Sequence, residues 1–181
     1  IHMLFKWNQI YNFTAVKTVS EMIERHWKDS LTIAKYLEGG RIIDVGTGPG
    51  LPGIPLSIMF PEKNFCLLDS NEKRQIFLQQ VVHQLKLSNV SLHCGRAENY
   101  AVEQKYDCII ARAFKPLPEM LRLTKHLLDK EGTVLAMKGK IDDSELAEID
   151  QDFVVTDVIP LQVLSQEQAR HLVKVRFKKA F

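Results

Sequence analysis

From residue 40 onward, short apolar runs alternate with stretches in which apolar residues recur at helical spacing. The apolar runs predict seven strands, over Arg41–Val45, Phe65–Leu68, Val90–His93, Tyr106–Ala111, Thr133–Met137, Phe153–Ile159 and His171–Phe177. The stretches between them predict helices over Pro52–Met59, Asn71–Leu87, Leu117–Leu128 and Asp142–Ile149. This alternation is typical of an α/β protein with a mostly parallel sheet and helices on both faces.

Both ends of the chain depart from this alternation. The last two predicted strands have no helical crossover between them, so we expect them to be antiparallel and joined by a loop over 160–169. Between Trp7 and Glu38, apolar residues at helical spacing predict a helix that Thr18 or Ser20 caps and that ends before Gly39. We expect an N-terminal helical extension over residues 1–38, with 1–3 a cloning remnant, and one main domain over 39–181.

The first predicted strand leads into a glycine-rich turn, Asp44-Val-Gly46-Thr-Gly48-Pro-Gly50-Leu-Pro-Gly53. Glycines at alternate positions let a backbone turn tightly and approach a ligand closely. Asp69 ends the next apolar run, where a carboxylate can accept hydrogen bonds from both hydroxyls of a ribose. The pattern predicts a site for a cofactor that contains adenosine.

Two cofactor classes fit this turn. Read from Gly48, it matches the Gly-x-Gly-x-x-Gly pattern of dinucleotide-binding oxidoreductases, with an acid about 20 residues on. Read from Asp44, it matches the Asp-x-Gly-x-Gly-x-Gly pattern of enzymes that use S-adenosylmethionine. The strand-end acid would repel a pyrophosphate, and Pro49 and Pro52 remove two N–H donors. The turn therefore favours a methyltransferase, and an NAD-dependent oxidoreductase or a turn without ligand remain as alternatives.

Composition sets broad limits on the protein. The 181 residues, 45% of them hydrophobic, suit one globular domain. We find no apolar run of membrane-spanning length and no secretory signal, so we expect a cytoplasmic protein with its three cysteines as reduced core thiols. The net charge of +2 is too small to indicate an RNA partner, but Arg170–Lys179 contains five cations and no acid. This stretch is a candidate phosphate contact or, equally, a solvated edge strand.

Several segments together resemble a known family. They are Asn12-Phe-Thr-Ala15, Arg25-His26-x-x-Asp29-Ser30, the Asp44–Pro55 turn with its Gly-Leu-Pro-Gly-Ile-Pro run, Leu67-Leu68-Asp69-Ser70-x-x-Lys73-Arg74, Arg112-Ala113-Phe114, Lys138-Gly139 and Arg170-His171-Leu172. In this order they resemble the glucose-inhibited division protein B family, bacterial methyltransferases that act on small-subunit (16S) ribosomal RNA. The chain departs from the family in a shorter N-terminus and in Ala111, where a serine is more usual.

The resemblance implies a Rossmann-like class I methyltransferase with a seven-stranded sheet. It implies methyl transfer from S-adenosylmethionine to N7 of a guanine in small-subunit ribosomal RNA, within a ribosomal subunit or an assembly intermediate. We expect a monomer without a metal ion. A non-catalytic RNA- or ribosome-binding module on the same fold remains an alternative, because N7 carries no proton and its methylation needs no diagnostic general base.

Candidate site residues follow from the turn, the resemblance and the strand ends. For the cofactor they are Gly46, Gly48, Leu51, Asp69, Ala97, Glu98 and Arg112. For substrate positioning they are Arg112, Lys138 and Phe114, which could stack on the base. For RNA they are Arg25, His26, Arg170, His171 and Lys174. The Asn/Asp-Pro-Pro-aromatic motif of enzymes that methylate exocyclic amines is missing after Ala111, which counts against that chemistry.

Overall fold

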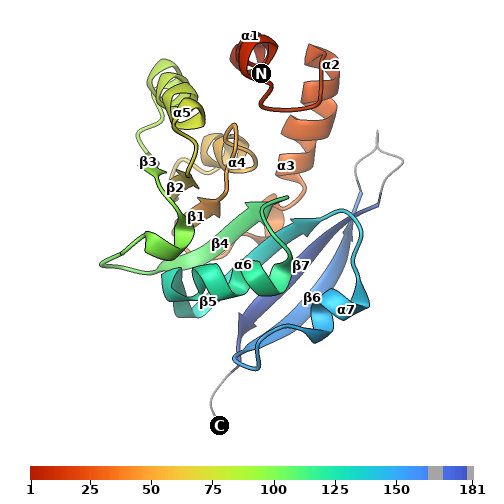
Figure 1. The fold of residues 1–181 in the computed structure, drawn as a ribbon. Coiled ribbons are helices and arrows are strands. Elements are labelled where there is room, and N and C mark those ends of the chain that lie inside the picture. Colours follow the sequence, from red (N-terminus) through yellow and green to blue (C-terminus); the bar gives the residue numbers. More distant parts are fainter. Residues whose placement is uncertain (163–168, 179–181) are drawn as a thin grey trace.

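A computed structural model describes residues 1–162 and 169–178, in which seven strands form one sheet in the order β3-β2-β1-β4-β5-β7-β6 (Figure 1). The strands are β1 (Arg41–Val45), β2 (Asn64–Asp69), β3 (Val90–Cys94), β4 (Tyr106–Arg112), β5 (Leu128–Lys138), β6 (Phe153–Leu161) and β7 (Arg170–Phe177). Strands β1 to β5 pair in parallel, and β7 is antiparallel to both β5 and β6. The predicted sheet and its antiparallel end are confirmed, and most of the predicted loop over 160–169 lies outside the described residues.

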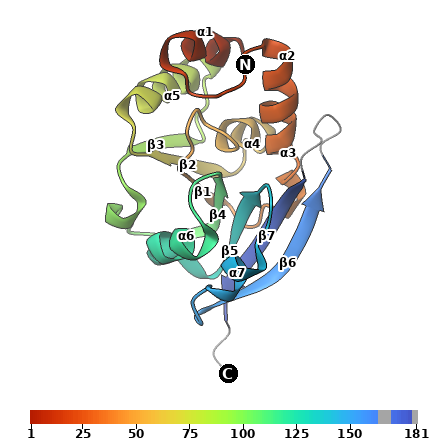
Figure 2. The same cartoon turned by 45° about the vertical axis from the view of Figure 1, so that its right-hand side comes forward.

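Helices cover both faces of the sheet (Figure 2). They are α1 (His2–Tyr11), α2 (Val19–Met22), α3 (Asp29–Leu31), α4 (Gly53–Met59), α5 (Glu72–Leu85), α6 (Leu117–Thr124) and α7 (Asp143–Ala147). Successive side chains of a strand point to opposite faces. In β1, Ile43 joins a core cluster with Leu117 and Met120 of α6, whereas Ile42 joins one with Leu56 of α4. Each face therefore has its own apolar layer.

The N-terminal segment differs from the single predicted helix. Thr18 caps α2 as expected: its hydroxyl accepts from the Glu21 N–H at 3.2 Å and donates to the Glu21 carboxylate at 2.9 Å. After α2 the chain widens into a π-helical segment, Ile23–Lys28, continues as α3 and ends in a 3₁₀ turn at Ala34–Tyr36. Apolar spacing does not distinguish these helix types. The π and 3₁₀ periods each differ from the α-helical period by less than one residue per turn, and the segments are too short for that difference to show.

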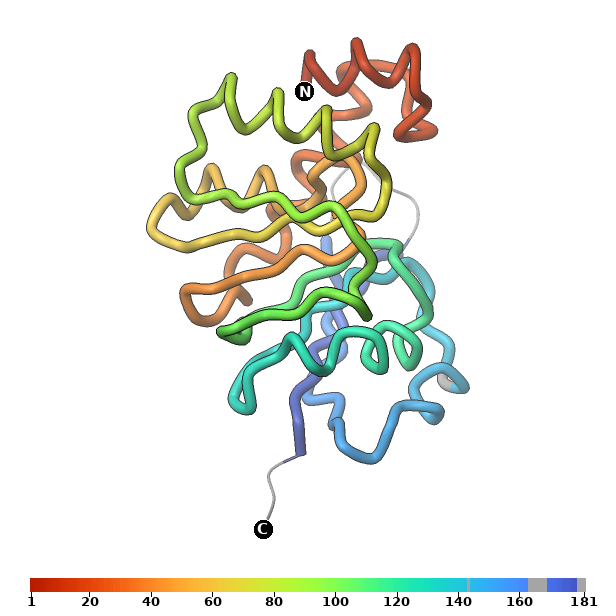
Figure 3. Tube along the Cα trace, turned by 60° about the vertical axis from the view of Figure 1, so that its left-hand side comes forward, coloured from red at the N-terminus to blue at the C-terminus, as the bar shows by residue number. Residues whose placement is uncertain are grey.

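Helix α1 was not predicted, and it packs beside α5 (Figure 3). Leu4 of α1 shares an apolar cluster with Phe77, Leu78 and Val81 of α5. The Asn8 amide, buried at 3% exposure, donates to the Val16 carbonyl at 2.9 Å and so fixes the turn that follows the helix. The extension is thus held against the main sheet by apolar packing.

Two smaller expectations were wrong. Helix α6 ends at Thr124 rather than Leu128, because Leu128 already pairs with Tyr106 as the first residue of β5. Cys94 is exposed at the end of β3, whereas Cys66 and Cys108 are core thiols as expected. Among the described helices, none has the length and apolarity that crossing a membrane requires.

Candidate active site

A cavity of about 510 Å³ lies at the carboxyl edge of the parallel strands. Its walls come from the turns after β1, β2 and β3 and from the segment after β4, and they include Gly46, Asp69, Ala97, Glu98 and Phe114. Small-molecule sites typically enclose roughly 300–1,000 Å³ and lie at this edge in open α/β sheets. The fold therefore brings together four of the predicted cofactor residues, Gly46, Asp69, Ala97 and Glu98.

The Asp44 side chain anchors the glycine turn by two hydrogen bonds. Its Oδ2 accepts hydrogen bonds from the Thr47 hydroxyl at 2.6 Å and from the Gly53 N–H at 2.7 Å. Within the turn, Gly46 and Gly48 have φ angles of +66° and +59°, which a side chain tolerates poorly. Asp44 thus ties both ends of this tight turn to the end of β1.

The Asp44 carboxylate also sets the electrostatics of the turn. It is fully buried, and its Oδ1 has no hydrogen-bond partner in the described part of the chain. Burial raises its pKa to about 6, so the group remains mostly ionised at neutral pH. A buried anion behind the turn, with one oxygen left without a partner in the described residues, disfavours a pyrophosphate and favours a cationic group such as the ammonium of a methionine moiety.

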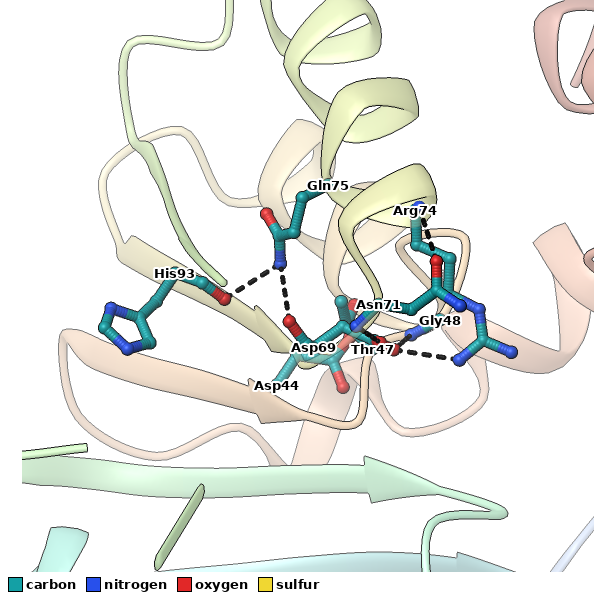
Figure 4. A network of polar contacts seen from close by, with 8 residues as sticks. All are labelled: Asp44, Thr47, Gly48, Asp69, Asn71, Arg74, Gln75 and His93. Atoms are coloured by element: carbon teal, nitrogen blue, oxygen red, sulfur yellow. Dashed lines mark hydrogen bonds and ion pairs between the residues drawn. The ribbon is translucent and has the colours of Figure 1, made fainter. Parts of the chain in front are cut away.

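Asp69 connects the end of β2 to the same turn (Figure 4). It is 4% exposed; its Oδ2 accepts from the Gly48 N–H at 2.9 Å and the Arg74 guanidinium at 3.1 Å, and its Oδ1 accepts from the Asn71 N–H at 2.9 Å. A carboxylate offers about four acceptor positions, so one remains for a ribose hydroxyl. The position of Asp69 in the cavity wall suits that role.

Two residues that were not among our site candidates support Asp69, although the sequence segment that resembles the family includes Arg74 (Figure 4). Arg74, in the first turn of α5, pairs with its carboxylate and lines the cavity. The buried Gln75 amide donates to the Asp69 carbonyl at 3.3 Å and to the His93 carbonyl at 2.8 Å, which links the ends of β2 and β3. The position of Arg74, in the first turn of the helix that follows a strand-end acid, is the signal that could have indicated it.

The other predicted cofactor residues have varied surroundings. Ala97 is 2% exposed, and Glu98 is exposed with its carboxylate 4.0 Å from the Arg96 guanidinium. Phe114 lies over the glycine turn: a Cβ atom built on Gly46 would be 2.3 Å from its ring. Leu51 lies outside the cavity, in the apolar cluster between α1 and α5.

A second, basic pocket of about 330 Å³ adjoins the first, and Ala113 lines both. It gathers the predicted residues Arg25, His26, Arg112, Lys138, Arg170 and His171. Strand pairing explains the grouping: β7 is antiparallel to β5, so His171 at its start lies opposite Lys138 at the end of β5. The structure therefore unites substrate and RNA candidates beside the cofactor cavity.

Both strand-end cations in the basic pocket have carboxylate partners. Arg112 donates to Asp29 at 3.1 Å, and Lys138 pairs with Glu145 at 2.5 Å. The Arg112 side chain lines this pocket and not the cofactor cavity, although it was a candidate for both. Asp29 was not among our candidates, because nothing local in the sequence shows which strand end its carboxylate reaches.

His26 is a structural histidine in this pocket. Its Nδ1 lies 3.0 Å from the Arg25 carbonyl and its Nε2 lies 2.7 Å from the Thr14 hydroxyl, so Nδ1 carries the proton in the neutral ring and Nε2 accepts. Burial, reinforced by the Arg112 charge, lowers its pKa to about 4. His26 is therefore neutral at pH 7 and offers no charge to a phosphate.

Lys174, which we predicted as an RNA contact, does not line the basic pocket. Its ammonium pairs with Glu38 at 2.6 Å, and Arg176 pairs with the same carboxylate. β7 runs away from the carboxyl edge at about 3.4 Å per residue, so only its first residues reach the pocket. Lys179, in the same basic stretch, lies outside the described residues.

The sequence of this chain matches a known protein family and several of its members. The family model of rRNA small subunit methyltransferase G matches residues 1–173. The chain is 47% identical to ribosomal RNA small subunit methyltransferase G from Photobacterium profundum, over 99% of this chain and 87% of the relative. It is also 47% identical to the protein of that name from Shewanella woodyi, over 97% of this chain and 85% of the relative.

The fold has solved counterparts. A glycopeptide N-methyltransferase complexed with S-adenosylhomocysteine aligns with a TM-score of 0.71 at 9% identity, over 84% of this chain and 87% of that one. The cavity, the turn and the strand-end acid fit the S-adenosylmethionine cofactor of such enzymes, and the dinucleotide alternative falls away. The chain belongs to the GidB family of small-subunit ribosomal RNA methyltransferases, which use S-adenosylmethionine.

Proposed function

We propose that this protein transfers the methyl group of S-adenosylmethionine to N7 of a guanine in small-subunit ribosomal RNA. The observation that carries the proposal is the pair of adjoining pockets, one lined by the glycine turn and Asp69 and one basic, with Ala113 in the wall of both. In this arrangement the cofactor and the base enter from different sides and meet at the segment after β4.

The residues of the larger cavity would hold the cofactor. Asp69 would accept from a ribose hydroxyl, the Gly46–Gly48 turn would lie along the methionine moiety, and Ala97 with Glu98 would bind the adenine edge. S-adenosylmethionine supplies an electrophilic methyl group on a sulfonium. Asp44 lies behind the glycine turn with one oxygen unpartnered in the described residues, so it would favour the ammonium of the methionine moiety on that turn.

The chemistry requires alignment more than proton transfer. N7 of guanine has an in-plane lone pair and no proton, so no general base is needed. Catalysis then depends on orienting N7 toward the methyl group and on excluding water. Arginine and lysine commonly bind the N7 and O6 edge of guanine, but N7 must stay free here, so Arg112 and Lys138 would hold O6 or a phosphate.

Charge pairing in the basic pocket supports the same chemistry. The guanine gains positive charge during transfer, which unpaired cations nearby would oppose. Arg112 and Lys138 are each paired with a carboxylate, Asp29 and Glu145 respectively. The pocket therefore keeps hydrogen-bond donors for O6 while reducing repulsion at N7.

The substrate would be a folded particle. Sequence-specific RNA recognition favours exposed bases in loops, held in one orientation. The basic pocket has a volume of about 330 Å³, and Lys174 and Arg176 are paired with Glu38 outside it, so affinity for free RNA should be weak and strongly dependent on salt. A single chain contains both pockets, which fits a monomer working where ribosomal subunits assemble, in the cytoplasm.

Transfer of a radiolabelled methyl group tests this proposal. Small-subunit particles from cells lacking the enzyme should accept label, whereas protein-free RNA should accept little and already modified particles none. S-adenosylhomocysteine should inhibit the reaction. Binding of the particles without any transfer would overturn the proposed function.

A further inference from the structure

Asp29 is a buried charge that joins the N-terminal segment to two strands of the sheet. It lies in α3 and is 1% exposed. Its Oδ2 accepts from the Arg112 guanidinium at 3.1 Å, and its Oδ1 lies 3.9 Å from Nε of Arg170. Arg112 ends β4 and Arg170 begins β7. The Asp29 carboxylate therefore lies between the two arginines that strands contribute to the basic pocket.

Anchoring the N-terminal segment does not explain this charge. A buried ion pair is a poor source of stability, because desolvation offsets most of its attraction, and apolar residues of similar size often do as well. The segment is already fixed by the buried side chains of Leu4, Val16, Met22 and Ile33 in two apolar clusters. Asp29 also keeps one oxygen, Oδ1, without a hydrogen bond in the described residues, which is a further cost.

The geometry around Arg112 indicates what the charge achieves. The Arg112 side chain is 19% exposed, and the same nitrogen that contacts Asp29 lies 3.5 Å from the Arg25 carbonyl. Two acceptors of the N-terminal segment thus restrict a long, otherwise mobile side chain in the wall of the basic pocket, next to Ala113, which lines both pockets. A guanidinium held by its partner presents its remaining donors in a fixed plane.

We propose that Asp29 is a positioning residue for methyl transfer, acting through Arg112. It orients the Arg112 guanidinium toward the base or phosphate in the basic pocket and compensates one positive charge near the atom that becomes cationic. The N-terminal segment is then part of the substrate site and more than a cover. This inference rests on the proposed function.

A double-mutant cycle tests the proposal on small-subunit particles, with Asp29→Asn, Arg112→Gln and the double variant. If Asp29 acts through Arg112, each single variant lowers kcat/KM by roughly ten- to a hundredfold, the effect of losing a charge-assisted hydrogen bond, and the double variant is no worse than the poorer single one. The loss lies mainly in kcat, and S-adenosylhomocysteine affinity stays within about twofold. A residue with a merely structural role would lower kcat, cofactor affinity and melting temperature together.

Glu38→Gln is the matched control. Glu38 ends the same N-terminal segment and pairs with two cations of β7, but outside the basic pocket. Its replacement should leave kcat unchanged. If Asp29→Asn does not fold, Arg112→Lys provides the test, because lysine keeps the positive charge but lacks the planar guanidinium. A positioning role predicts that Arg112→Lys loses as much kcat as Arg112→Gln.

Three results would overturn the inference: wild-type kcat in Asp29→Asn, losses that multiply in the double variant, or wild-type kcat in Arg112→Lys. Failure of the wild-type protein to transfer methyl groups would instead refute the proposed function.

Discussion

Replacing Asp69 with asparagine probes the two tasks that the structure gives this carboxylate, shaping the glycine turn and binding the ribose. Asp69 accepts from three donors, the N–H groups of Gly48 and Asn71 and the guanidinium of Arg74. An asparagine has one acceptor oxygen and one donor group. In either orientation of the amide, at least one of the three donors faces another donor, and the ion pair with Arg74 is lost.

The magnitude follows from these contacts. A hydrogen bond to a charged group contributes about 1.5–3 kcal/mol, so the free energy of unfolding of Asp69→Asn should fall by about 2 kcal/mol. For a domain of this size the melting temperature then drops by roughly 4–8 °C. Loss of the one bond to the ribose should weaken S-adenosylhomocysteine binding by roughly ten- to a hundredfold.

Urea denaturation gives the first quantity and calorimetric titration the second. Asp150→Asn is a suitable control. The Asp150 carboxylate accepts from the Asp152 N–H at 2.9 Å, as Asp69 accepts from the Asn71 N–H, but Asp150 does not line the cavity. A stability loss with unchanged affinity would show that Asp69 shapes the turn and does not bind the cofactor. If neither quantity changed, the reasoning from its contacts would be refuted altogether.

Three further predictions follow from single contacts. Gly46→Ala should lower stability and cofactor affinity because its Cβ would meet the Phe114 ring at 2.3 Å, and adding Phe114→Ala should restore part of the stability in thermal melts; no restoration would contradict the clash. Because the pKa of His26 is about 4 in the folded protein and ordinarily 6.5, the unfolded state binds more protons between these values. Stability is therefore lost as pH falls, and His26→Gln should remove about 2 kcal/mol of that loss between pH 7 and 4.5 in denaturant titrations, whereas an unchanged pH dependence would exclude this histidine as its source. Arg170→Glu should reduce methylation of particles while sparing cofactor affinity, whereas Lys174→Glu should lower stability with little effect on kcat; equal losses of kcat would place both residues in the RNA site.

Parallel pairing explains why part of the site was predictable. Once Arg41–Val45 and Asn64–Asp69 are neighbouring parallel strands, the glycine turn and Asp69 must meet at one edge, whatever the side-chain packing. Ala97 and Glu98 reach the same cavity because β3 pairs in parallel with β2. The parallel direction of the strands, which the alternating pattern predicted, brings these residues to one edge of the sheet, and the strand order found in the structure makes them neighbours.

What was missed depends on contacts between distant segments. The Asp29–Arg112 pair joins residues 83 positions apart, and no local pattern encodes it. Leu51 follows the glycine turn yet faces an apolar cluster, because the direction of its side chain depends on how the turn enters α4. The basic stretch after Arg170 appeared continuous in the sequence, but in an extended strand only its start can reach the carboxyl edge.

Mapping the transferred methyl group is the most direct test of the central claim. Small-subunit particles from cells lacking the enzyme would be incubated with the protein and labelled S-adenosylmethionine, and the modified nucleoside would be identified after digestion of the RNA. The account predicts one labelled product, 7-methylguanosine from the small-subunit RNA, and a lower initial rate of its formation when Asp69→Asn is assayed at a cofactor concentration that saturates only the wild type. A methyl group found on an adenine, a ribose or a ribosomal protein would contradict it.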